Sequence, residues 1–140
     1  MLVLPTGQIL LTDFSNDVEV YTPAASNEPE WAPIILNTQL LLKRRNSYQI
    51  SGLRFNGMSQ GAAYGDDEQA ATNFPLVRIT NLATHHVFYS RTHNHSSMAV
   101  ASNSVVSTHF DVPATQETGL SELQVVANGI PSNPVLVLVF

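Results

Sequence analysis

Residues 75–90 read PLVRITNLATHHVFYS, and this stretch carries the clearest structural signal in the chain. Residues 75–80 are rich in branched apolar side chains and have the composition of a buried β-strand. An Asn-Leu-Ala turn follows at 81–83, and residues 84–90 have the pattern of a second strand. We therefore predict a pair of β-strands over this stretch.

Segments of similar composition lie on both sides of this pair, at roughly ten-residue spacing and separated by Gly, Pro and Asn. They predict further strands at 33–36, 39–42, 47–52, 96–101, 105–112, 122–127 and 135–140. Alternation within residues 47–52 places Tyr48 and Ile50 on one face. Asn56-Gly57 and Asn128-Gly129 are strong turn signals, because both residue types tolerate positive φ. The pattern is typical of an all-β sandwich.

The chain before residue 34 divides into two parts. Residues 7–12 and the strictly alternating residues 17–21 predict an antiparallel pair of strands joined through 13–16. Residues 24–33 are rich in Pro, Ala, Ser and Glu, a linker composition in which only Trp31 is expected to pack. The domain prediction is an N-terminal β-hairpin over 1–23, a linker over 24–33 and a sandwich over 34–140.

The composition limits the class of protein. With 140 residues, 44% of them hydrophobic and 12% charged, the chain is expected to form one folded, soluble domain. A net charge of -5 argues against nucleic acid as a partner, because a phosphate backbone requires clustered Lys and Arg. No stretch has the features of a signal peptide or the length of a membrane span, so no membrane partner is expected and the location is not predicted. The absence of cysteine excludes disulfides and thiolate sites.

Residues 89–98, YSRTHNHSSM, form a polar run between two predicted strands, where a hairpin tip or inter-strand loop is expected. His93 and His95 are two residues apart, so they share one face of a strand or converge in a loop. Imidazole nitrogens at such a place can bind copper, nickel or zinc. A third ligand would have to come from His85, His86 or His109. The alternative interpretation is a pair of hydrogen-bonded surface histidines without metal.

Three other groups of residues offer weaker functional signals. Residues 58–73 predict a long loop with a helical turn at 67–71, where Asp66, Asp67 and Glu68 are either calcium ligands or solvated loop residues. Ser96 or Ser97 beside His95 suggests a nucleophile and its base, but no nucleophile-elbow pattern surrounds them. A third group comprises aromatic side chains that either line a carbohydrate-binding surface or fill the core: Tyr21, Trp31, Tyr48, Phe55, Tyr64, Phe74, Phe88 and Tyr89.

The first part of the sequence also resembles a known family. Residues 4–12, LPTGQILLT, followed by 17–23, DVEVYTP, resemble the end of the last blade of a kelch-type propeller. Residues 31–55 are similar to the opening of the immunoglobulin-like (E-set) domain that follows the propeller in galactose oxidase and glyoxal oxidase relatives. The resemblance implies an immunoglobulin-like sandwich that belongs to a kelch or galactose oxidase-like protein. Relatives in that family are often secreted.

The same resemblance implies a role for one histidine. In galactose oxidase-like enzymes a hairpin of this domain supplies one copper-binding histidine from a Thr-His motif, and Thr92-His93 is the matching pair here. The following Asn94-His95 departs from the family pattern. The remaining ligands, including a tyrosine joined to a cysteine, belong to the propeller, and this chain has no cysteine. The copper site would therefore need a separate propeller to complete it.

Residues 135–140 are apolar at every position, whereas a sandwich strand with one face in water alternates. Residues 1–21 or a second copy of the chain are expected to cover the outer face, which predicts a homodimer or larger assembly, or a separate propeller partner. The sequence thus predicts a non-catalytic structural or protein-interaction module. The alternatives are a carbohydrate-binding accessory domain and a copper-site component of an oxidase.

Overall fold

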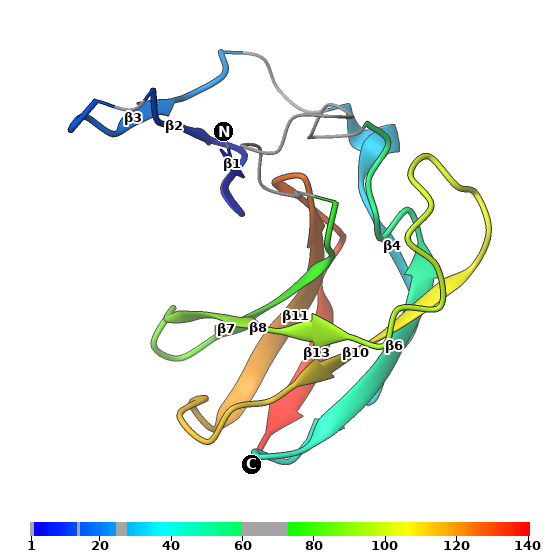
Figure 1. Ribbon diagram of the computed structural model, residues 1–140. Helices are drawn as coiled ribbons and strands as arrows, with labels where there is room; N and C mark the ends of the chain where they lie inside the picture. Colours follow the sequence, from blue (N-terminus) through cyan, green and yellow to red (C-terminus); the bar gives the residue numbers. More distant parts are fainter. Residues whose placement is uncertain (1, 14, 25–27, 60–72) are drawn as a thin grey trace.

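The computed structural model describes residues 2–13, 15–24, 28–59 and 73–140. Its strands form three sheets, two of which face each other as a β-sandwich (Figure 1). Within these ranges the one helical element is the 3₁₀ turn η1, Pro29–Trp31. The prediction of an all-β sandwich is therefore confirmed. The described residues include no helix long and apolar enough to cross a membrane.

The first sheet of the sandwich has four strands in the order β4-β6-β10-β9. These are β4 (Ile34–Asn37), β6 (Ser47–Leu53), β10 (Val106–Asp111) and β9 (Thr92–His93). Each neighbouring pair is antiparallel, and a register shift interrupts the β4–β6 ladder after Ile35. The sheet is therefore assembled from segments that lie far apart in the sequence.

The second sheet has six strands, five of them in the order β5-β13-β11-β7-β8. These are β5 (Leu41–Leu42), β13 (Val135–Val139), β11 (Gly119–Ala127), β7 (Leu76–Asn81) and β8 (Val87–Ser90), and β12 (Ile130–Pro131) pairs with β11. All pairs are antiparallel except β5 with β13, which is parallel. The short strands β4 and β5 follow each other in the chain but belong to different sheets.

The core lies between the two sheets, and strand alternation explains its members. Ile50 and Phe110 point inward from the four-stranded sheet, while Val77, Ile79 and Leu123 point inward from the six-stranded one, all fully buried. The predicted shared face of β6 is confirmed, because Tyr48 packs on this cluster next to Ile50. The Asn-Gly turns are also present. Gly57 has φ 73°, while Asn128 and Gly129 have φ 49° and 80°.

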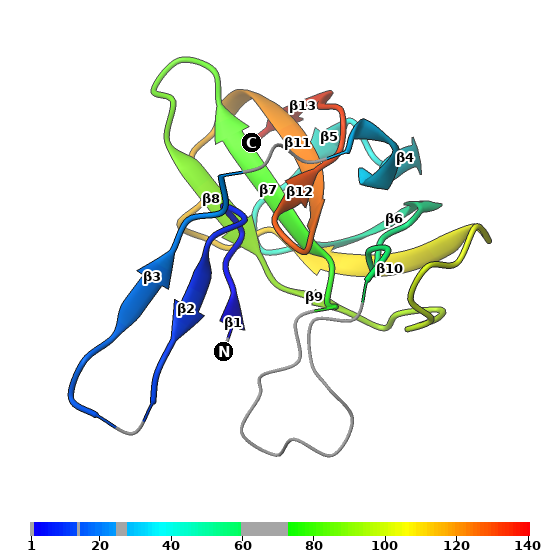
Figure 2. The same cartoon turned by 90° about the horizontal axis from the view of Figure 1, so that it is seen from above.

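The N-terminal sheet stands apart from the sandwich (Figures 1 and 2). The predicted pair is present as β2 (Ile9–Leu11) and β3 (Glu19–Tyr21), and β1 (Leu2–Val3) adds a third strand that was not predicted. The turn at Gly7 approaches the β11–β12 turn so closely that a Cβ on Gly129 would collide with the Gly7 backbone. Two glycines thus permit the contact between this sheet and the sandwich.

The expectation that Trp31 packs is wrong, since its residue is 49% exposed. Trp31 closes η1, and the guanidinium of Arg54 reaches this segment by donating to the carbonyls of Glu30 and Ala32. Backbone polar groups therefore anchor the linker to the sandwich, which leaves the indole free to face solvent.

The predicted strand at 96–101 is also wrong, and the run 89–98, expected as a hairpin tip or inter-strand loop, is one only in part, because Thr92 and His93 form β9 and the loop to β10 begins after them. After β8 the chain crosses at Arg91 to the opposite sheet, where Thr92 pairs with Phe110 in β10. Residues 96–101 form no strand, and the carbonyls of Ser97 and Ala99 accept hydrogen bonds from the Asn56 side chain. A side-chain amide thus occupies carbonyls that a neighbouring strand would otherwise engage.

The outer face of β13 is not covered by residues 1–21. Leu136, Leu138 and Phe140 remain 54%, 43% and 52% exposed, whereas Val137 and Val139 are buried. The strand therefore has one core face and one apolar face in water. The predicted long loop at 58–73, with its helical turn at 67–71, lies almost wholly outside the described residues.

Candidate functional site

The sequence-predicted His93 lies on the outer face of the four-stranded sheet. It pairs with His109 of β10, and the two imidazole rings stack with centroids 5.8 Å apart and planes 23° apart. Its Nε2 lies 3.0 Å from Oδ1 of Asp111 and 3.2 Å from Oγ of Ser47, which stand opposite each other on β10 and β6. Three strands therefore contribute to one polar cluster.

The protonation of this cluster follows from its contacts. The hydrogen bond from His93 is the main reason that the pKa of Asp111 is lowered, with Ser47 also lowering it and partial burial opposing the shift. A charged Asp111 accepts the Nε2 proton of His93. The Ser47 hydroxyl has one proton, which it can donate either to the Asp111 carboxylate or to the Phe110 carbonyl at 3.4 Å, and in both cases its oxygen can share the same Nε2 proton.

Ser47, His93 and Asp111 are the residue types of a serine-hydrolase triad, but their geometry differs from one. In a triad, serine and aspartate contact opposite nitrogens of the imidazole, so that the ring can take the serine proton. Here both groups meet His93 at the same nitrogen, Nε2, and a proton held there by the Asp111 carboxylate leaves no lone pair to accept the Ser47 proton. The arrangement thus provides no general base for Ser47.

His95, the other predicted ligand, is held by different partners. Asn94 between the two histidines has φ 52°, which ends the strand alternation that would have placed both on one face. The Thr108 hydroxyl donates to the His93 carbonyl at 3.0 Å and lies 2.9 Å from His95 Nδ1. Burial, and secondly the charge of His93, lowers the pKa of His95, so its neutral form is favoured.

The remaining histidines do not gather around His93 and His95 as a group. His85 and His86 lie in the turn between β7 and β8, whereas His109 stacks on His93 and has a buried Nδ1 without a hydrogen-bond partner. In the part of the chain that the structure describes, no group of three or more His, Asp or Glu is placed to hold a metal ion. Copper binding at His93 and His95 stays a prediction. The proposed calcium ligands Asp66, Asp67 and Glu68 lie outside the described residues.

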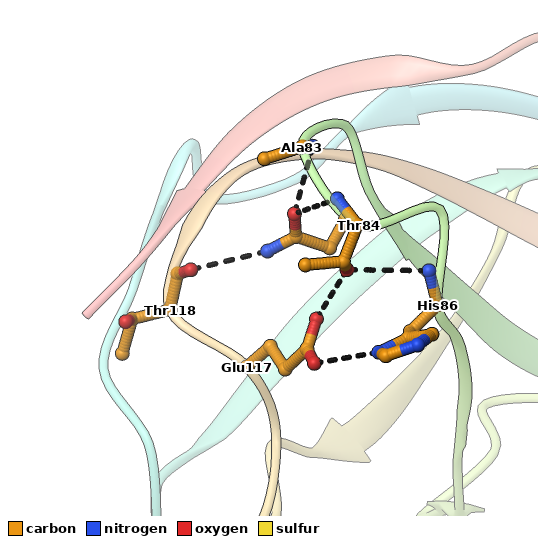
Figure 3. A network of polar contacts seen from close by, with 6 residues as sticks. Ala83, Thr84, His86, Glu117 and Thr118 are labelled. Carbon is orange, nitrogen blue, oxygen red and sulfur yellow. Dashed lines mark hydrogen bonds and ion pairs between the residues drawn. The ribbon is translucent and has the colours of Figure 1, made fainter.

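A second polar network, which sequence reasoning missed, joins the β7–β8 turn to the segment before β11 (Figure 3). Glu117 accepts a hydrogen bond from the Thr84 hydroxyl at 2.6 Å and lies 2.7 Å from Nδ1 of His86. The Thr84 contact first, and then the His86 contact, lowers the pKa of Glu117. Buried Asn81 accepts hydrogen bonds from the backbone N–H groups of Ala83 and Thr84 and donates to the Thr118 carbonyl.

Some of the other candidate side chains make structural contacts, and others are exposed on the surface. Ser96 and Ser97 both accept backbone hydrogen bonds, from the N–H groups of Ser107 and Ala99 respectively. Among the aromatic candidates, Phe55 is buried and Tyr48 packs against the core, while Tyr64 lies outside the described residues. Tyr21, Trp31, Phe74 and Tyr89 are exposed. Of these four, Phe74 and Tyr89 line one common groove.

Comparison with known proteins finds no family model and no curated protein that match this chain. The fold itself creates surfaces that can bind a partner or a ligand. Two of them stand out: the outer face of the six-stranded sheet, where leucines remain exposed, and the groove beside Phe74 and Tyr89.

Proposed function

We propose that the chain is a non-catalytic protein-interaction module of the immunoglobulin-like (E-set) type, and that it self-associates through the outer face of its six-stranded sheet. The observation that carries this proposal is a continuous apolar surface on that face. The absence of a general base for Ser47 in the His93 cluster agrees with a role in binding rather than in catalysis.

The order of the strands supports an immunoglobulin-like topology. In such sandwiches the first, second, fifth and fourth strands form one sheet, while the third, sixth and seventh form the other. The order β4-β6-β10-β9 fits the first sheet, and β13-β11-β7 fits the second, with β8 as an added strand at the edge. The resemblance of residues 31–55 to the E-set domain of galactose oxidase-like proteins points in the same direction.

The proposed docking surface is built by strand register. Leu41, Leu138 and Leu120 occupy directly paired positions on β5, β13 and β11, and the Leu82 backbone N–H donates to the Leu120 carbonyl. These residues therefore form one row across the sheet. We call the row and its exposed neighbours the apolar face: Leu41, Leu82, Val87, Leu120, Leu136, Leu138 and Phe140.

The size of the apolar face suits a second copy of the chain. Its members are each between 36% and 60% exposed. Together they present on the order of 500 Å² of apolar surface, the upper range for a monomer and a large part of the ~800 Å² that each partner contributes to a standard interface. Sheets commonly pack face to face in this way.

Charge also permits self-association. The row of four leucines contains no charged side chain, and the whole chain has a net charge of -5 from few charged residues, so repulsion between two copies is weak. Beside the row, Glu122 and Arg78 point outward from β11 and β7. A two-fold axis through the face can bring Glu122 of one copy to Arg78 of the other, because isologous interfaces pair a patch with itself.

Sedimentation equilibrium at micromolar concentrations tests this proposal. We expect the mass of a dimer for the unmodified chain and the mass of a monomer for Leu138→Glu. The matched control is Gln49→Glu, which adds the same charge to the exposed outer face of the other sheet and leaves the dimer intact. A monomeric unmodified chain, or equal dissociation in both variants, would refute self-association and favour a different protein, such as a propeller, as the occupant.

A further inference from the structure

A groove of about 520 Å³ lies where β8 ends and the chain crosses to β9, within the usual size range of ligand sites. It is lined by Phe74, Leu76, Tyr89, Ser90, Arg91 and Thr92. Leu76 pairs with Val126 near the end of β11, whereas the leucine row crosses the start of that strand at Leu120. The groove and the leucine row therefore lie at opposite ends of the six-stranded sheet.

Two aromatic side chains in this groove are left in water. Phe74 is 48% exposed and Tyr89 is 40% exposed, whereas Phe55 and Phe110 are fully buried in the core. Tyr89 pairs with Arg78, so it points to the outer side of the sheet, and Phe74 lies just before the start of β7. The fold thus keeps two rings accessible at one place, although exposed aromatic surface is unfavourable without a ligand.

The polar groups of the groove differ in how far they are already engaged. Arg91 is exposed and forms no direct hydrogen bond or ion pair with a described side chain, but its charge acts on Asp111 and helps to lower the pKa of that carboxyl. The Ser90 hydroxyl is buried and points to the core side of the sheet, as its register partner Val77 does, so it is not accessible from the groove. The Thr92 hydroxyl is already engaged, since it donates to the Pro75 carbonyl. One exposed cation without a direct ion-pair partner therefore lies beside the two rings.

We propose that this groove binds a sugar ring that carries one carboxylate, such as a uronic acid at the end of a glycan. Aromatic faces pack against the C–H faces of a pyranose, and a guanidinium binds a carboxylate through two parallel hydrogen bonds. A single cation and a net charge of -5 favour one carboxylate over a polyanion. The groove borders the apolar face at β8, where Tyr89 pairs with Arg78, but its lining residues lie outside the leucine row.

A titration followed by ¹H–¹⁵N NMR tests the site, with glucuronic acid and glucose as the two probes. We expect the backbone amide signals of Tyr89 and Arg91 to shift with both sugars, at millimolar affinity and about fivefold tighter for glucuronic acid. Arg91→Gln removes the preference for glucuronic acid but retains glucose binding. Phe74→Ala weakens both, while Trp31→Ala, which removes an exposed ring outside the groove, changes neither.

The same titration in the Leu138→Glu background separates this site from self-association. Binding is expected to be unchanged there, because Leu138 lies outside the groove. No shift at Tyr89 and Arg91 with either sugar would overturn the site. Equal affinity for both sugars in the unmodified chain would overturn the role of Arg91 and hence the acidic ligand.

Discussion

His93 Nε2 lies 3.0 Å from Asp111 Oδ1 on the outer face of the four-stranded sheet. The contact joins β9, a strand of only two residues, to the end of β10. So short a strand forms few ladder hydrogen bonds, and side-chain contacts therefore contribute a larger part of its attachment. The pair links the crossing at Arg91 to the body of the sheet.

This pair predicts a dependence of stability on pH. The folded-state pKa of Asp111 is lowered from 3.8, chiefly by His93. The charged carboxylate therefore adds to the free energy of unfolding above that pH, and this stabilisation is lost as the pH falls through the lowered pKa. Because the carboxylate is half-exposed and screened by water, Asp111→Asn should cost about 0.5 kcal/mol at neutral pH. Urea unfolding at pH 7 and near pH 2 measures the difference, which should vanish at the lower pH.

Asp17→Asn is the control for that experiment, because its carboxylate makes no hydrogen bond within the described part of the chain. It should leave the free energy of unfolding nearly unchanged at both pH values. A cost of Asp111→Asn that persists at low pH would show that the charged contact with His93 is not its source.

The Glu117 network predicts the effect of two substitutions on one pKa. The Thr84 hydroxyl is the largest single cause of a Glu117 pKa below 4.5, and His86 lowers it further through a hydrogen bond and its charge. Thr84→Val and His86→Ala should therefore each return the NMR titration midpoint of the Glu117 carboxyl toward 4.5. The stabilisation from Glu117 is present above that pH and is lost as the pH falls through its lowered pKa. An unchanged midpoint in Thr84→Val would contradict the 2.6 Å contact with Thr84.

Removing the buried amide of Asn81 is expected to destabilise the fold strongly. Its side chain accepts from the N–H groups of Ala83 and Thr84 at 2.9 and 3.2 Å and donates to the Thr118 carbonyl at 3.1 Å. Asn81→Ala leaves these backbone groups without partners and should lower the free energy of unfolding by about 2–4 kcal/mol. With both variants made in the Leu138→Glu background, where the chain is expected to be monomeric, Leu82→Ala in the same turn should cost less than about 1 kcal/mol, and equal costs in a urea titration would contradict the amide's role.

A larger residue in place of Gly52 is expected to collide with the backbone of β4, which pairs with β6. A Cβ at this position would collide with the Ile34 carbonyl and would lie 2.6 Å from the Phe55 ring. Gly52→Ala should therefore cost about 3 kcal/mol or more, because the backbone oxygen of β4 cannot move without breaking its pairing. The neighbouring Ser51→Ala is the control and should stay within about 0.5 kcal/mol. A thermal unfolding series compares the two variants, and similar melting temperatures would refute the collision.

Local pattern was enough to predict most of the strands. The branched residues of 75–80, the alternation of 47–52 and the two Asn-Gly turns are recognisable without knowledge of neighbours, because side-chain alternation and positive φ are properties of short segments. The same reasoning failed at 96–101, where the Asn56 side chain, distant in the sequence, occupies the carbonyls.

The candidate site depends on contacts between residues far apart in the sequence, which the pattern of a short segment does not reveal. Ser47 and Asp111 are 46 and 18 residues from His93, and strand register alone brings them to its Nε2 atom. His95 turns to Thr108 because Asn94 adopts positive φ, which spacing along the chain does not reveal. Composition thus specified an all-β chain with an apolar final strand. The pairing of distant strands placed the histidines apart, gathered the leucines into one face and opened the groove, because register between strands depends on the whole packed core.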